Sequence, residues 1–238
     1  MKIIQLFAAV FFATTFTADA AVSAEEKQKQ MEEALVKSAD AAKSDLTRIQ
    51  CGNLVYATNR SSVCFADAFL GEVGKTTSLD VGKSFVPVKA ESDTLFNFPF
   101  LVWSGQDSFN LTQKERDNLR RYLSNGGFII SSPGCSDANW DKSLRREIQL
   151  MFPDQKLDKV PMTHPLFSTV LSIPRLTDKA GKSQQVEGLE INGRLAMVYS
   201  REGLNDVKNA KGCCCCGGNE IMQAAQVNLN ALVYALLY

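Results

Sequence analysis

From Cys51 onward, short apolar segments alternate with longer segments of helical period, and this alternation leaves few architectures open to the chain. The strand-like segments are residues 53–57, 98–105, 128–132 and a pair within 189–200; the helix-like segments are residues 63–73, 111–127, 140–152 and 219–237. Strands that alternate with helices form crossover units, in which a mostly parallel sheet is covered on both faces. We therefore expect an α/β fold with a mostly parallel central sheet.

Local signals fix several of these boundaries. Thr112 followed by Glu115 is a capping box that opens a helix, and the glycines after Asn125 are suited to its left-handed end. Asn192-Gly193 is a strong hairpin signal between two short strands. In a parallel sheet the loops at the carboxyl ends of the strands gather at one edge, where ligands bind.

The N-terminus has the pattern of a secretory signal. One early lysine precedes an apolar run from Ile3 to about Thr17, and the small residues Ala18 and Ala20 form an A-x-A cleavage pattern. We expect cleavage after Ala20, with Ala24 as second choice, and no stable membrane span after it. The expected divisions are a signal over residues 1–20, an amphipathic helix over 21–48 and an α/β domain over 49–238. The mature protein should be exported to the periplasm or outside the cell.

Two further patterns bear on partners. The helix over residues 25–49 has an apolar stripe that can pack on the domain or on a protein partner. Lysine and arginine together number 26, as do aspartate and glutamate, so the formal net charge is zero. A chain without a basic excess has no field that would hold nucleic acid. We expect no nucleic-acid partner.

A family resemblance rests on residues 96–167. This run contains the aromatic and proline-bearing strand "FPFLVWSG", the helix-to-strand passage "ERDNLRRYLSNGGF", the "FPD" stop and the "HPLF" turn. It resembles the family called domain of unknown function 4159, and the resemblance extends from residue 48 to the C-terminus. The family implies a flavodoxin-like three-layer sandwich related to class I glutamine amidotransferases, without an established activity. The segment "GLNDVKNAKGCCCCGGNEI" resembles the mark of a cysteine-rich subgroup within this family.

The amidotransferase relationship implies a cysteine nucleophile on a strained strand-to-helix turn, with a histidine nearby. Cys135 follows a strand, and His164 is the single histidine. These two residues would be the catalytic pair of a hydrolase or transferase. The sequence departs from the amidotransferase pattern, because Cys135 lacks the glycine-flanked elbow and its spacing to His164 differs. The amidotransferase activity is therefore not carried over, and a cysteine-dependent enzyme is an alternative interpretation.

The chain has seven cysteines: Cys51, Cys64, Cys135, Cys213, Cys214, Cys215 and Cys216. The quartet and two of the single cysteines follow predicted strands, so six thiols should meet at the carboxyl edge, joined by His164. Cys51 precedes its strand and should lie at the opposite edge. The glycines beside the quartet, Gly212, Gly217 and Gly218, permit tight turns.

This arrangement leaves three functions open. The first is a metal- or thiol-redox-binding module that takes thiolate ligands for Zn or Cu(I) from the quartet Cys213–Cys216, Cys64 or Cys135, or an imidazole ligand from His164. The second is the enzyme that uses Cys135 and His164. The third is a non-catalytic envelope interaction protein, in which the cysteines form structural disulfides.

Overall fold

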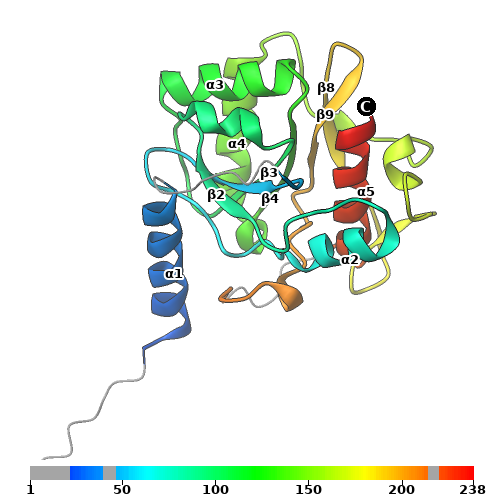
Figure 1. The fold of residues 1–238 in the computed structure, drawn as a ribbon, viewed down its shortest axis with the longest axis horizontal. Helices are drawn as coiled ribbons and strands as arrows, with labels where there is room; N and C mark the ends of the chain where they lie inside the picture. The colour runs from blue at the N-terminus through cyan, green and yellow to red at the C-terminus, as the bar shows by residue number, and fades with distance from the viewer. Residues whose placement is uncertain (1–21, 40–46, 214–219) are drawn as a thin grey trace, which may run out of the picture.

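The computed structural model describes residues 22–39, 47–213 and 220–238. Within them a seven-stranded sheet runs through the centre in the order β2-β1-β3-β4-β9-β8-β5 (Figure 1). Its strands are β1 (Cys51–Val55), β2 (Val86–Lys89), β3 (Phe100–Gly105), β4 (Phe128–Pro133), β5 (Asp158–Lys159), β8 (Glu187–Ile191) and β9 (Arg194–Tyr199). The first five in this order are parallel, and β8 pairs antiparallel with both β9 and β5. The parallel strands follow the doubly wound order of flavodoxin.

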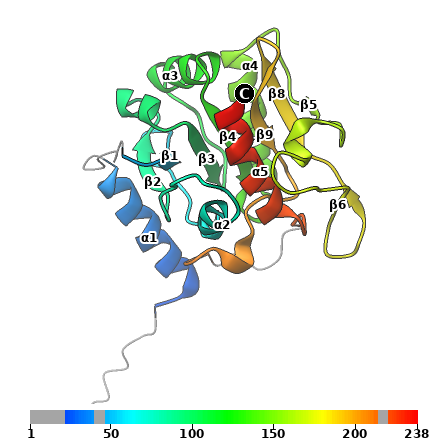
Figure 2. The same cartoon turned by 45° about the vertical axis from the view of Figure 1, so that its right-hand side comes forward.

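Helices cover both faces of this sheet. α2 (Ala68–Thr76) packs with α5 (Ala224–Leu237) on one face, and α3 (Gln113–Ser124) packs with α4 (Ala138–Met151) on the other (Figures 1 and 2). α1 (Ala24–Ser38) stands at the side of the molecule. Short 3-10 turns are η1 (Asp93–Asn97), η2 (Gly134–Ser136), η3 (Pro165–Phe167) and η4 (Val207–Asn209), and β6 (Leu176–Thr177) pairs with β7 (Ser183–Gln184). The expected α/β, flavodoxin-like sandwich with an N-terminal helix is confirmed.

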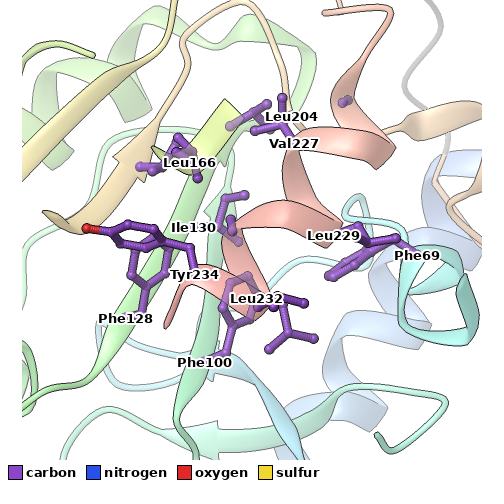
Figure 3. Close-up of a cluster of buried hydrophobic side chains, with 14 of the residues drawn as sticks. Phe69, Phe100, Phe128, Ile130, Leu166, Leu204, Val227, Leu229, Leu232 and Tyr234 are labelled. Atoms are coloured by element: carbon purple, nitrogen blue, oxygen red, sulfur yellow. The ribbon is translucent and has the colours of Figure 1, made fainter. Parts of the chain in front are cut away.

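The core has one apolar cluster on each face of the sheet. On the α5 face, the rings of Phe100 and Phe128 stack with centroids 5.7 Å apart, and Tyr234 meets Phe128 edge-on (Figure 3). Leu229 and Leu232 of α5 pack in the same cluster. Because β3 and β4 are buried on both faces, residues 100–103 and 128–130 are continuously apolar rather than alternating.

Two sequence signals act as expected. The hydroxyl of Thr112 accepts a hydrogen bond from the backbone N–H of Glu115, and the backbone N–H of Thr112 donates to the carboxylate of Glu115. Asn192 and Gly193 have positive φ angles of 54° and 76°, which fit the tight turn between β8 and β9.

Other boundaries differ from expectation. The helix expected over residues 63–73 begins only at Ala68, because the backbone N–H of Ala66 donates to the carbonyl of Asn205 and ties this stretch to another loop. Strand β2 was not expected from the sequence, and it contains Pro87 at the edge of the sheet, where a missing donor is tolerated. The helix expected over residues 219–237 begins at Ala224.

The expected signal, residues 1–20, lies outside the described residues. In the part of the chain that is described, no helix combines the length and the apolar character needed to cross a bilayer.

Gly105, at the carboxyl end of β3, permits a close approach that a side chain would prevent. A Cβ atom there would collide with the hydroxyl of Tyr56 and the indole nitrogen of Trp140, two groups that are hydrogen-bonded to each other at 2.7 Å. Gly105→Ala should lower the free energy of unfolding by about 1–3 kcal/mol, as overpacking does. Urea unfolding measures this change.

Gly71→Ala is the matched control, because nothing lies within 4 Å of a Cβ atom at this position in α2. It should raise stability by about 0.5–1 kcal/mol through the helix preference of alanine. Equal unfolding midpoints for Gly105→Ala and the wild type would contradict the tight packing at β3.

Candidate functional site

A disulfide joins two loops at the carboxyl edge of the sheet. Cys64 follows β1 and Cys213 follows β9, and their sulfur atoms are bonded across 149 residues of sequence, with Cα atoms 4.8 Å apart. The expectation that the loop after β1 and the start of the cysteine quartet meet is therefore confirmed. Cys214, Cys215 and Cys216 lie outside the described residues.

The backbone around this disulfide is held by Asn205, which is buried. Its amide nitrogen donates to the carbonyl of Cys64 at 2.7 Å and to the hydroxyl of Ser104 at 3.2 Å. Its own carbonyl accepts from Ala66 at 2.8 Å, and the hydroxyl of Ser62 accepts from the backbone of Cys64 at 3.0 Å. One side chain thus connects the loop after β9 to the loop after β1 and to β3, and the disulfide adds a covalent bond between the first two.

Cys135 occupies the strand-to-helix turn after β4. It has a left-handed backbone, with φ 51° and ψ 30°, and Ser136 after it has φ 53°. Such angles cost energy for residues other than glycine and are concentrated at functional sites. The side-chain amide of Gln106, which follows β3, donates to the sulfur of Cys135 at 3.3 Å, and this sulfur is disulfide-bonded. Cys135 therefore lies at the predicted edge and is oxidised.

Two carboxylates lie at the same edge of the sheet. Glu220 is nearly buried, and its carboxylate accepts from the backbone N–H of Val207 at 2.7 Å. Burial raises the pKa of Glu220 from its ordinary value. Asp206 has a left-handed backbone and accepts from the side chain of Asn209 at 2.7 Å. Both acids hold the loop after β9 in place.

Cys51 lies at the opposite edge, as expected. It is the first residue of β1, it is buried, and its thiol is free. Burial raises the pKa of this thiol to about 12. A thiol that stays protonated and inaccessible is a poor nucleophile and a poor metal ligand.

His164 does not join the cysteines, and the expectation that it shares their edge is wrong. Its ring lies 5.3 Å from that of Tyr234, which in turn contacts Phe128 at 5.9 Å. Phe128 is the first residue of β4, whereas Cys135 follows the last. A strand of this length separates its ends by about 20 Å. The structure therefore does not bring the proposed catalytic pair together.

The local role of His164 is to cap a turn. Its Nδ1 accepts a hydrogen bond from the backbone N–H of Leu166 at 3.1 Å, at the start of η3. This contact requires an unprotonated Nδ1. The imidazole thus caps the first turn of η3, and this structural function is compatible with its position before Pro165.

No group of three or more potential ligands among the histidines, cysteines, aspartates and glutamates of the described residues could hold a metal ion. Cys64 and Cys213 are consumed by their disulfide in this state. The metal ligands predicted from the sequence stay a prediction, because three of the four quartet residues lie outside the description.

Asn205 was not singled out from the sequence. It follows β9 and reaches the carboxyl edge, but loops after strands are commonly polar, so nothing in its residue type marks it. Tyr56 was also missed: it was expected within a strand, and it instead follows β1, with its hydroxyl bonded to the indole of Trp140.

The single histidine allows a direct measurement. Burial, opposed in part by the charge of Glu190, lowers the pKa of His164 below its ordinary value of 6.5. The native protein therefore favours the neutral imidazole. The unfolded chain binds a proton at this histidine more readily, so the folded state loses stability as the pH falls from the unfolded-state pKa toward the lower native pKa. NMR of the one imidazole should give a titration midpoint below 6.5.

His164→Asn is the matched control, because its side-chain oxygen can accept the same bond from Leu166. Its stability should lack the decrease toward acidic pH that is due to the imidazole. A wild-type midpoint at or above 6.5 would contradict the burial of this ring.

Comparison with curated proteins finds no match to this chain. The family model described as "Domain of unknown function (DUF4159)" matches residues 46–236, which include the whole sheet, α2 to α4, and α5 except for Leu237. The chain therefore belongs to the domain of unknown function 4159 family.

Proposed function

We propose that this protein is an exported α/β domain in which the cysteine-rich loop acts as a thiol–disulfide element at the carboxyl edge of the sheet. The observation that carries the proposal is the disulfide between Cys64 and Cys213. It connects the loop that begins the cysteine quartet to the loop after β1, so its redox state controls whether the two loops are covalently joined. The cysteine-rich loop would mark a subgroup of the family.

The redox step is a two-electron exchange. A dithiol outside the chain attacks the bond between Cys64 and Cys213, which breaks as the dithiol becomes a disulfide. Two thiols are then left on the chain. Oxidation by a protein disulfide reverses the step. Cys135 is itself disulfide-bonded and has a left-handed backbone. This supports the view that the backbone at this edge is strained next to its reactive cysteines.

A hydrolase that uses Cys135 and His164 has less support. The two side chains lie near opposite ends of β4, and the sulfur of Cys135 is oxidised. A relationship to the amidotransferases is supported at the level of the sheet order only, and it supplies no nucleophile with a neighbouring imidazole.

A thiolate-metal state is a second candidate, and one observation favours it. The Cα atoms of Cys64 and Cys213 lie 4.8 Å apart, so that after reduction the two sulfurs could bind one soft metal such as Zn or Cu(I). The rest of the ligand set would come from the quartet. Metal would then compete with reoxidation for the same pair of sulfurs.

Removing the disulfide tests its contribution. Cys64→Ala should lower the free energy of unfolding by about 2–5 kcal/mol, because a bond that closes a long loop restricts the unfolded chain strongly. Thermal unfolding with and without a dithiol should show a large fall for the wild type and a smaller one for the variant.

Cys51→Ala serves as the control, since this thiol is free and buried at the other edge. It should keep the wild-type response to the dithiol. Peptide mapping of the oxidised protein should recover Cys64 joined to Cys213; a free Cys64 in protein purified without reductant would overturn the proposal. Zinc or copper bound by the reduced wild type and lost in Cys64→Ala would support the metal state.

Export makes a prediction about the mature N-terminus. Ser23 caps α1: its hydroxyl accepts a hydrogen bond from the backbone N–H of Glu26, and its own backbone N–H donates to the carboxylate of Glu26. Cleavage after Ala20 keeps this capping box, whereas cleavage after Ala24 removes it, at a cost of about 1 kcal/mol. Sequencing of the secreted protein should begin at Ala21. A mature protein that retains Met1 would contradict export by this signal.

A further inference from the structure

The strand order creates a crevice between β1 and β3. The chain leaves β1 through α2 toward one face of the sheet, and it leaves β3 through α3 toward the other. In doubly wound sheets this point of reversal opens a gap outside the carboxyl ends of the two strands, and ligands bind there. The sheet therefore contains a second candidate site, separate from the disulfide.

A cavity of about 550 Å³ occupies this position. It lies over Tyr56, which follows β1, and over Gln106 and Asp107, which follow β3. The turn at 59–61 forms another wall, and the side of α1 that carries Glu32 and Val36 closes it. The volume falls in the range of sites for small molecules. No cysteine among the described residues lines the cavity, so this inference goes beyond the thiol proposal.

The floor of the cavity is rigid. Tyr56 is buried, and its hydroxyl donates to the carbonyl of Ser104 at 3.2 Å while accepting from the indole of Trp140 at 2.7 Å. The backbones of Tyr56 and Arg60 exchange two hydrogen bonds, of 2.7 and 2.8 Å. Asp107 is held at a left-handed φ of 62°. The loops that carry Arg60 and Asp107 are therefore preorganised, which reduces the cost of binding.

Charges of both signs surround the cavity. The cations are Lys29, Lys37 and Arg60, and the carboxylates are Glu32, Glu33 and Asp107. Within the described residues none of these six forms an ion pair, although the guanidinium of Arg60 donates to the carbonyl of Gln106 at 3.4 Å. Three of these charges influence the hydroxyl of Tyr56. Burial raises the pKa of Tyr56; the positive charge of Arg60 opposes this effect, and the negative charges of Glu32 and Asp107 add to it.

We propose that this cavity binds a small zwitterion with a free ammonium and a free carboxylate, an amino acid or a short peptide. Arg60 binds the carboxylate, because its planar guanidinium matches two carboxylate oxygens. Asp107, on the opposite loop, binds the ammonium, with Glu32 beside it. A ligand with only one charge would leave the other set of side chains unpaired.

Glu32 supports this assignment. It accepts from the side chain of Gln28 at 3.1 Å and from the backbone of Val63 at 3.4 Å, which fixes it between α1 and the domain. Burial raises the pKa of Glu32, although these hydrogen bonds oppose the effect. A bound ammonium would favour the charged carboxylate, so binding should lower the pKa of Glu32.

Calorimetry on the mature protein tests the proposal with four probes: L-alanine, L-alanyl-L-alanine, its C-terminal amide and its N-acetyl derivative. The dipeptide or the free amino acid should bind, and the stronger of the two identifies the source. Each blocked dipeptide should bind about tenfold more weakly than the free dipeptide, the loss expected for one charged hydrogen-bonded contact.

Two variants assign the ends of the ligand. Arg60→Gln should weaken the free dipeptide about tenfold and make it equal to its amide, since the contact to the carboxylate is already lost. Asp107→Asn should do the same for the N-acetyl derivative, and asparagine tolerates the left-handed backbone. Arg120→Gln, an exposed arginine on α3 paired with Asp117, is the control and should bind as the wild type does.

Three results would overturn the proposal. They are no binding of either L-alanine or the free dipeptide at millimolar concentration, equal binding of the free and blocked dipeptides, and unchanged affinity in both variants. Because no cysteine takes part, each result can be obtained on protein whose disulfides are intact. Failure here is thus distinguishable from failure of the thiol proposal.

Discussion

The burial of β1, β3, β4 and β9 on both faces is the constraint on which the rest of the structure depends. Strands that are buried on both faces need a helix layer on each side, and the right-handed crossovers that supply these layers keep the strands parallel. Parallel strands then deliver their following loops to a single edge. Tyr56, Gln106, Cys135 and Asn205 meet there for this reason, although the sequence separates them widely.

Two sites follow from this one edge, and they use it differently. In one part the loop after β9 is joined to the loop after β1, by Asn205 and by the disulfide of Cys64 with Cys213. Between β1 and β3 the loops diverge and leave a cavity under α1. The disulfide and Asn205 hold the backbone of the loop after β1 at Cys64, and Tyr56 and Arg60 of the same loop line the cavity. Stability and recognition are thus located on neighbouring parts of one segment.

The sequence predicted the features that depend on local chemistry or on strand order. The capping box at Thr112, the turn at Gly193 and the meeting of Cys64 with Cys213 are of this kind. His164 was misplaced because it follows β4 by way of a helix and a crossing to the far edge strand, and its position is set by packing on Tyr234. No short-range pattern records that contact. The cavity under α1 depends likewise on how a separate helix docks, which the periodicity of that helix does not determine.

Cys51 has a consequence for how unfolding of this protein can be followed. The thiol is free, but it lies at the start of the first strand of the sheet, with no exposed surface and a pKa raised to about 12. An alkylating reagent can reach it only when the central strands separate. The rate of its modification therefore reports the frequency of global opening, independently of the oxidised cysteines at the other edge, and the chain carries its own probe of kinetic stability.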